Sequence, residues 1–139
     1  MKQLMYRNQG LAEAGSVGDA AAAVGSAYQR IANATAGAAT LVAGKDILPG
    51  GILVRTGAGG AYSDTLPTGA LMDDAFAADY AIGESFKMRI CSHVAFAETI
   101  AAGTGNTAVA GSLTAVPAND SADFIFTRTA VDTWTYEQI

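Results

Sequence analysis

The sequence contains one cysteine, one histidine and one tryptophan among 139 residues. Because Cys91 is the only cysteine, an intrachain disulfide and a cysteine-rich zinc site are excluded. His93 has no second histidine with which to build a histidine-rich metal site. No apolar run reaches the ~18 residues of a membrane span. The first ten residues, MKQLMYRNQG, lack the apolar centre of a signal peptide.

Positive charge is also scarce, since eight Lys and Arg face thirteen Asp and Glu, for a net charge of -5. This balance argues against nucleic-acid binding, which needs a basic face to neutralise phosphates. The charge is uneven along the chain, because residues 1–65 are net positive and residues 66–139 carry nine of the acids. Lys2 and Arg7 lie in a first segment without acids. That segment is either solvated surface or a basic arm that meets an acidic partner.

Large apolar residues are few, although half of the composition counts as hydrophobic. Thirty residues are alanine, and Leu, Ile, Val and Phe together number 29. That share lies just above the ~20% below which charged chains tend to be disordered. The length suits one domain. We therefore expect a small folded body with poorly ordered segments, or a core completed between subunits.

The chain divides into an N-terminal arm with an Ala/Gly-rich segment, residues 1–27, and a β-rich body, residues 28–139. Alternation and β-branched residues predict strands at YQRIANAT, GAATLVAG, GILVRTG, AYSDTLP, SFKMRICS, AFAETIAAG, SLTAVPAND, SADFIFTRT and VDTWTYEQI. Thr68 is the expected N-cap of one short helix in GALMDDAFAADY, residues 69–80. In SFKMRICS, Phe86, Met88 and Ile90 are expected to face the core.

This pattern predicts a mainly β fold, either an antiparallel β-sandwich or a jelly-roll-like barrel. One short helix and an extended, partly ordered N-terminal arm complete the expected architecture. Antiparallel pairing is the expected topology because the later strands are joined by short polar turns. The glycine-rich stretches GAGG and GTGN match no phosphate-binding motif, so we interpret them as hairpin turns.

Candidate chemical groups are sparse. No GxSxG elbow occurs, and Ser92 and His93 are expected on opposite faces of a strand. Cys91 is interpreted as a small buried filler. The acids Asp73, Asp74 and Asp79 would either hold a divalent cation or lie near the helix N-terminus, where the helix dipole favours them. Trp134 and Tyr136 would stack on a sugar, fill the core or form a subunit interface. We expect no enzymatic activity and no cofactor.

A longer pattern combines several of these segments. The stretches are SDTLPT, then GESFKMRI, then TIAAGTG, and finally FIFT and WTY. Together they resemble a recurrent module of tailed-phage virion proteins. The resemblance covers residues 62–139, and residues 1–61 share no motif with it. NTAVAGS is richer in alanine than the corresponding strand, and SHVAFAE replaces a more polar turn.

The resemblance implies a virion structural role without catalysis, in a head decoration protein or a fibre-like appendage. Because the chain is short and has no internal repeat, we expect a capsid decoration (cement) protein, a homotrimer on the outside of the major capsid protein lattice. It would be assembled in the host bacterial cytoplasm and would meet neither nucleic acid nor membrane. The expected partner-binding residues are Lys2, Leu4, Met5, Tyr6 and Arg7. The alternatives are a head fibre, tail or head-tail joining subunit, or a glycan-binding β-sandwich module.

Overall fold

Nine strands and one helix make up residues 28–139, the part of the chain that the computed structural model describes. The predicted arm and Ala/Gly-rich segment, residues 1–27, lie outside the described residues. In chain order the elements are β1 (Arg30–Asn33), β2 (Ile52–Arg55), β3 (Tyr62–Thr65), α2 (Gly69–Phe76), β4 (Ser85–Ser92), β5 (Glu98–Ala101), β6 (Asn106–Ala108), β7 (Ala115–Val116), β8 (Asp120–Ala130) and β9 (Thr133–Gln138).

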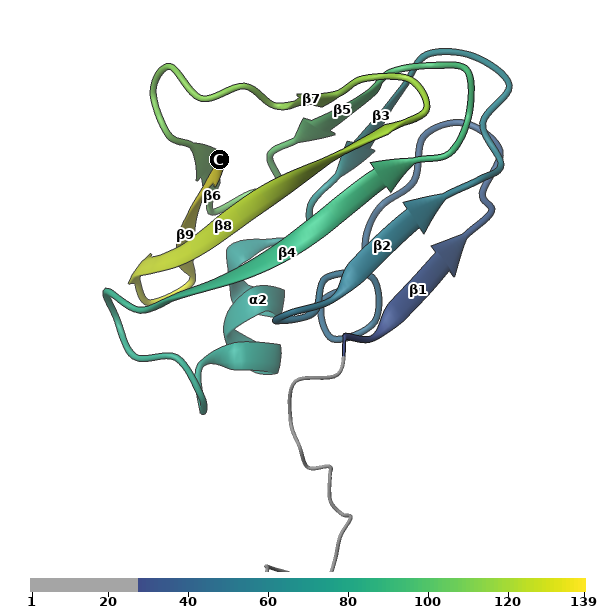
Figure 1. Ribbon diagram of the computed structural model, residues 1–139. Coiled ribbons are helices and arrows are strands. Elements are labelled where there is room, and N and C mark those ends of the chain that lie inside the picture. The colour runs from purple at the N-terminus through teal and green to yellow at the C-terminus, as the bar shows by residue number, and fades with distance from the viewer. Residues whose placement is uncertain (1–27) are drawn as a thin grey trace, which may run out of the picture.

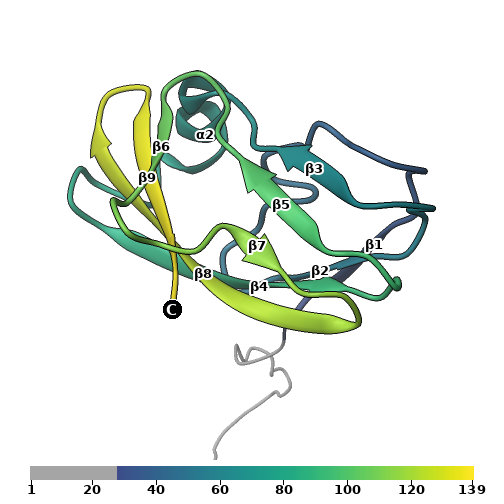
Figure 2. The same cartoon turned by 90° about the horizontal axis from the view of Figure 1, so that it is seen from above.

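The strands form two sheets that face each other (Figures 1 and 2). The larger sheet has the order β1-β2-β4-β8-β9-β6, and the smaller has the order β3-β5-β7. Helix α2 lies beside both sheets and closes one end of the space between them (Figure 2). The prediction of a mainly β, two-layered fold with one short helix is confirmed.

The strand pairing is mixed, so the expected antiparallel pairing is found in some pairs and is wrong for others. Pairs β4/β8, β8/β9 and β5/β7 are antiparallel, whereas β1/β2, β2/β4, β3/β5 and β6/β9 are parallel. The chain changes sheet after every strand from β2 to β7, so β2 and β4, like β3 and β5, are separated by one strand of the other sheet. Such a double crossing lets the returning strand run parallel to its neighbour, as in β2/β4 and β3/β5, which a tight hairpin cannot produce.

The two glycine-rich stretches lie on these crossings, so their interpretation as hairpin turns is also wrong. GAGG joins β2 to β3, and GTGN joins β5 to β6, whose first residue is Asn106. Gly103 is required there by space, because an added Cβ would lie 2.3 Å from the carbonyl oxygen of Leu66. The close approach of two backbones explains why a residue without a side chain occupies the crossing.

The core lies between the sheets and combines aliphatic side chains with a group of packed aromatic rings. Strand β4 alternates as predicted, with Phe86, Met88 and Ile90 buried and Lys87 and Arg89 exposed. The rings of Phe86 and Phe126 stack with their centroids 5.3 Å apart. The other large members of the core are Leu41, Ile47, Leu53, Leu66, Met72, Phe76, Ile100, Val116, Phe124, Trp134 and Tyr136. Few large apolar residues therefore suffice, because most of them enter one cluster.

Helix α2 begins as predicted and ends earlier than predicted. The Thr68 hydroxyl accepts a hydrogen bond from the amide of Leu71 at 3.3 Å, which makes Thr68 the N-cap. Met72 and Phe76 face the core, and the helix ends at Phe76 rather than near residue 80. Gly69 packs against the final hairpin so closely that a Cβ would lie 1.9 Å from the Asp132 carbonyl oxygen.

Candidate functional site

Asp73 connects helix α2 to the hairpin of β8 and β9. Its carboxylate accepts hydrogen bonds from Arg128 Nη2 at 2.6 Å and from Trp134 Nε1 at 2.8 Å. The backbone amide of Asp132 donates to the same carboxylate at 2.9 Å. The hydrogen-bonded Arg128 guanidinium holds the pKa of Asp73 below its usual range. Asp73 is therefore an ionised structural residue whose lone pairs are already used.

This arrangement explains Asp73 by neither of the two interpretations of the helix acids. The first turn of α2 contains no acid, so attraction to the helix dipole does not explain Asp73. Asp74 and Asp79 are exposed, and neither shares the hydrogen bonds that Arg128 donates to Asp73. Within residues 28–139 no group of three His, Cys, Asp or Glu side chains is placed to hold a metal ion. The ion pair with Arg128 is the physical reason for an acid at position 73.

Trp134 and Tyr136 lie in the core of the same chain. Trp134 has no exposed surface, and Tyr136 is 3% exposed and donates its hydroxyl hydrogen to the carbonyl of Ile100. Both predicted outward roles, a subunit interface and a sugar-stacking surface, are corrected by this burial. The alternation of the two aromatics correctly predicted a common face. That face is covered by the second sheet and the helix rather than by a partner.

Sequence reasoning missed a buried ion pair between the two sheets. Arg55 of β2 and Asp64 of β3 both have fully buried side chains, and Arg55 Nη2 lies 3.0 Å from an Asp64 carboxylate oxygen. The remaining guanidinium hydrogens go to the carbonyls of Asn33, Thr35 and Gly37. Arg55 thereby fixes the loop after β1 to both sheets. Its signal in the sequence was a charged residue on the inward face of GILVRTG, two positions after Leu53.

Glu98 of β5 adds a second buried carboxyl group to this site. Its side chain is inaccessible to solvent, and Tyr62 donates a hydrogen bond to it at 3.3 Å. Burial, together with the neighbouring Asp64 carboxylate, raises the pKa of Glu98 to about 9. Burial likewise raises the pKa of Tyr62 to about 12. With Glu98 neutral, the charge of Arg55 is balanced by Asp64 alone.

We call Arg55, Tyr62, Asp64, Ser92 and Glu98 the Arg55 cluster. A carboxyl group with a strongly raised pKa often marks a catalytic site. Here neither surface hollow described below is lined by a member of the cluster. The Ser92 hydroxyl is engaged by the Tyr62 hydroxyl at 3.0 Å. The geometry therefore indicates a clamp between the sheets.

Cys91 and His93 occupy the end of β4 and have separate environments. The Cys91 thiol is buried, and burial raises its pKa, so the prediction of a buried filler is confirmed. His93 is exposed while Ser92 is buried, as expected for opposite faces. The Ser92 hydroxyl donates to the Phe96 carbonyl at 2.8 Å. Among residues 28–139, neither Cys91 nor His93 is hydrogen-bonded to an acid or base that would make it a catalytic group.

Cys91 and His93 are both expected to be dispensable for folding and for partner binding. Cys91→Ala should cost ~1 kcal/mol in unfolding free energy, and His93→Gln should change it by less than ~0.5 kcal/mol, since neither breaks a polar network. Urea denaturation of the two variants measures these values. A normally folded His93→Gln variant that failed to bind its partner would show that His93 belongs to an undetected site.

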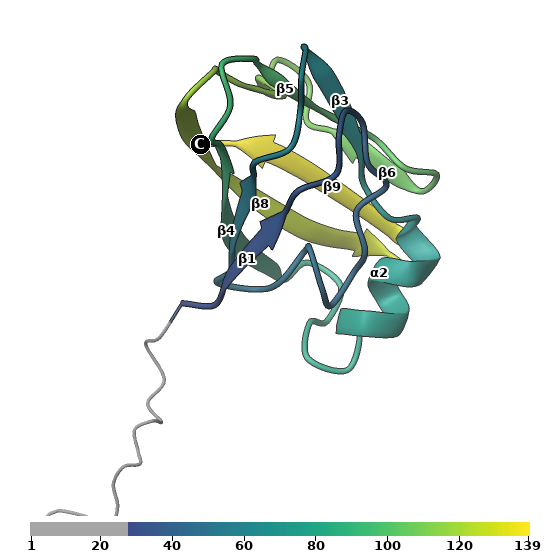
Figure 3. The ribbon, with the colours of Figure 1, turned by 90° about the vertical axis from the view of Figure 1, so that its right-hand side faces the viewer.

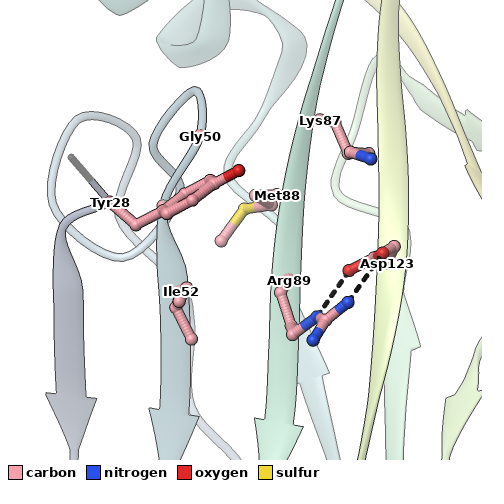
Figure 4. A pocket seen from close by; sticks show the side chains of 8 residues that line it. Tyr28, Gly50, Ile52, Lys87, Met88, Arg89 and Asp123 are labelled. Atoms are coloured by element: carbon pink, nitrogen blue, oxygen red, sulfur yellow. Dashed lines mark hydrogen bonds and ion pairs between the residues drawn. The ribbon is translucent and has the colours of Figure 1, made fainter. Parts of the chain in front are cut away.

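One surface hollow lies on the outer face of the large sheet, beside β1 (Figure 4). Its volume is about 210 Å³. Tyr28, which is 73% exposed, extends across it toward Met88, above Ile52. On the far side Arg89 donates two hydrogen bonds to Asp123, at 2.7 and 3.0 Å. The hollow thus combines an exposed aromatic ring with a fixed, polar ion pair.

The second hollow is larger, about 610 Å³, and lies between α2 and two loops. We call it the α2 groove. Its walls are residues 40–43, 65–68 and 102–104 together with Leu71, Asp74 and Ala75. Leu71 and Val42 are about half exposed there, at 54% and 49%. Asp74 is the one charged residue in the lining, so the groove is apolar with an acidic edge.

The other predicted contact residues, Lys2, Leu4, Met5, Tyr6 and Arg7, lie outside the described residues. None of the helices in residues 28–139 has the length and apolar character needed to cross a membrane. Neither a family model nor a curated protein matches this sequence.

Proposed function

We propose that this chain is a bacteriophage capsid decoration (cement) protein. In this proposal it binds the outside of the assembled major capsid protein lattice as a homotrimer and stabilises the head. Its role is structural rather than enzymatic, and it requires no cofactor. The proposal rests on the resemblance of residues 62–139 to the module of tailed-phage virion proteins, together with the positions that those motif residues occupy in the fold.

The observation that carries the proposal is that the quoted motifs coincide with residues that the fold depends on. In SDTLPT, Asp64 forms the buried ion pair and Thr68 caps the helix. In TIAAGTG, Gly103 has no room for a side chain. Phe126 and Trp134, from the last two motifs, lie in the core. The resemblance therefore involves residues that specify this fold. A match at such residues arises by chance less easily than a match in surface composition.

The surface also supports a protein that is covered by other subunits. At one corner, Leu113 and Ile139 are 68% and 60% exposed, and Val109 is 36% exposed. The corner is held together because Ser112 accepts a hydrogen bond from the amide of Gln138 at 2.8 Å. Adjacent exposed apolar side chains of this kind favour contact with another protein surface.

Stabilisation of a head would follow from mass action. A protein that binds only the assembled lattice stabilises it by ~2.7 kcal/mol per site at a hundredfold excess over its dissociation constant. Adding the purified protein to undecorated heads of the cognate major capsid protein should therefore raise their melting temperature. Electron microscopy of the same heads should show added density over the whole outer surface. Density confined to one vertex or to the tail would instead support the joining, fibre or tail alternatives.

Deletion of residues 1–10 should separate attachment from folding. Residues 28–139 form both sheets and a core among themselves, so the truncated protein should keep its melting temperature. Occupancy on heads should fall at least ~tenfold, equivalent to ~1.4 kcal/mol of binding free energy. Quantitative gel analysis of purified heads measures occupancy. Equal loading of truncated and full-length protein would place attachment on the β body.

A glycan-binding role is the second candidate. The observation that favours it is the hollow beside β1 that Tyr28 crosses. An exposed aromatic ring next to a bidentate Arg–Asp pair provides stacking and directed hydrogen bonds, the two contacts with which proteins hold sugars. Screening the protein against a glycan array tests this candidate. Tyr28→Ala should abolish any signal that arises from this hollow.

A further inference from the structure

The α2 groove has the properties of a preformed docking surface. Its floor contains Leu41 and Leu66, each 1% exposed and fixed by backbone hydrogen bonds. The amide of Leu41 donates to Thr65 at 2.8 Å, and the amide of Leu66 donates to Ala101 at 2.9 Å. Above this rigid floor, Val42 and Leu71 expose about half of their surfaces. A partner that covers them needs apolar side chains and little rearrangement of the groove.

The charge of the groove narrows the choice of partner. Asp74, exposed at the edge, is its one charged lining residue. A complementary segment would thus combine apolar side chains with nearby basic ones. The first residues of this chain have that composition, since Leu4, Met5 and Tyr6 lie between Lys2 and Arg7 without an acid.

The position of Tyr28 and the length of the preceding segment allow the first residues to reach a neighbouring molecule. The described chain begins next to β1, at one side of the body, whereas α2 lies at the opposite side (Figure 3). Residues 1–27 span up to ~90 Å when extended at ~3.3 Å per residue, enough to reach beyond their own body. We propose that the α2 groove receives the first residues of a neighbouring copy, with Leu4, Met5 and Tyr6 in the groove and a basic side chain at Asp74.

The inference rests on the proposed function, because a capsid lattice places copies side by side where such exchange links them. Its consequence is that each bound copy would help to hold the next. The contact is nevertheless a property of the protein alone, so it can be tested without heads. Failure of the groove contact and failure of capsid binding are thereby distinguishable.

Disulfide trapping tests the contact directly. In a Cys91→Ala background, one chain carries Tyr6→Cys and the other carries Leu71→Cys. Mixing the two concentrated proteins under oxidising conditions should give a linked heterodimer, because a disulfide forms only where Cβ atoms come within ~4.5 Å. Ile82→Cys is the matched control, since Ile82 is 57% exposed but does not line the groove. The yield of linked heterodimer with Leu71→Cys should be at least ~tenfold higher than the yield with the Ile82→Cys control.

Two results would overturn the proposal. The first is equal linking to Leu71→Cys and Ile82→Cys, which would mean random collision. The second is linking only within one chain that carries both Tyr6→Cys and Leu71→Cys, which would mean that the groove holds its own arm.

An independent measurement is self-association by sedimentation. Leu71→Lys should weaken it at least ~tenfold, because an added cation repels the basic segment. Ile82→Lys should leave it unchanged. Since Leu71 is already exposed, the melting temperature of both variants should stay near that of the parent, and equal self-association of the two would contradict the proposal.

Discussion

Replacement of Arg55 by methionine is expected to destabilise the protein by roughly 3–5 kcal/mol. The change leaves the Asp64 carboxylate buried without its cation and removes the donors to three backbone carbonyls. For a domain of this size the melting temperature should fall on the order of 10–30 °C. Thermal and urea unfolding of the purified variant measure both quantities.

The matched control is the exposed pair on the outer face of the large sheet. Arg89→Met breaks a similar bidentate contact with Asp123, but the two side chains are 52% and 24% exposed. Water replaces the lost contact there, so the cost should be below ~1 kcal/mol. Similar costs for Arg55→Met and Arg89→Met would show that the buried pair does not hold the sheets together.

The double variant Arg55→Met with Asp64→Leu separates the ion pair from its burial. Because both charges are then absent, neither is left uncompensated in the core. Much of the stability lost in Arg55→Met should return, as replacement of a buried pair by apolar residues is often neutral. A double variant as unstable as Arg55→Met alone would assign the loss to the unpaired carbonyls of the loop after β1.

Glu98→Gln is expected to change the pH dependence of stability. Glu98 ionises near 4.5 in the unfolded chain and near 9 in the folded protein. Between these values the folded state keeps a proton that the unfolded state has lost, so stability falls as pH rises through this window. One such proton gives a slope of ~1.4 kcal/mol per pH unit. From about pH 6 to about pH 8 the wild type should therefore lose roughly 2–3 kcal/mol.

The glutamine side chain at position 98 is uncharged at every pH. The Glu98→Gln variant should therefore not lose stability in this way as the pH rises. It should be more stable than the wild type near pH 8, because it avoids the cost of keeping a carboxyl group protonated. Glu84→Gln, at an exposed position, should retain the wild-type slope. Urea unfolding across this pH range compares the three proteins. A wild type whose stability does not fall from pH 6 to pH 8 would show that Glu98 is ionised in the fold.

Local features of the sequence predicted local structure well. The cap at Thr68 and the alternation around Met88 depend on neighbours in the chain, and the structure confirms both. Pairing between strands was less predictable, because the sheet that a strand joins depends on contacts made far away. Trp134 illustrates the limit, since alternation gives a face but not what covers it.

The Arg55 cluster was missed for the same reason. Asp64 and Glu98 are 34 positions apart in the sequence, and each by itself resembles a solvated acid. Their partnership exists only because β3 and β5 pair directly, with Asp64 opposite Ile100 and Tyr62 opposite Glu98. The available signal was Arg55, a charged residue on the inward face of an apolar strand. Its partners could be identified from this signal only if the strand register was already known.

The repeated passage of the chain between the sheets also determines how the protein responds to a cut. If a protease opened the connection between β4 and β5, both fragments would still contribute strands to both sheets. The pairs β3/β5 and β4/β8 would each join one fragment to the other. The two pieces would stay interlocked without a covalent link, so a nick in this exposed connection would not release a fragment.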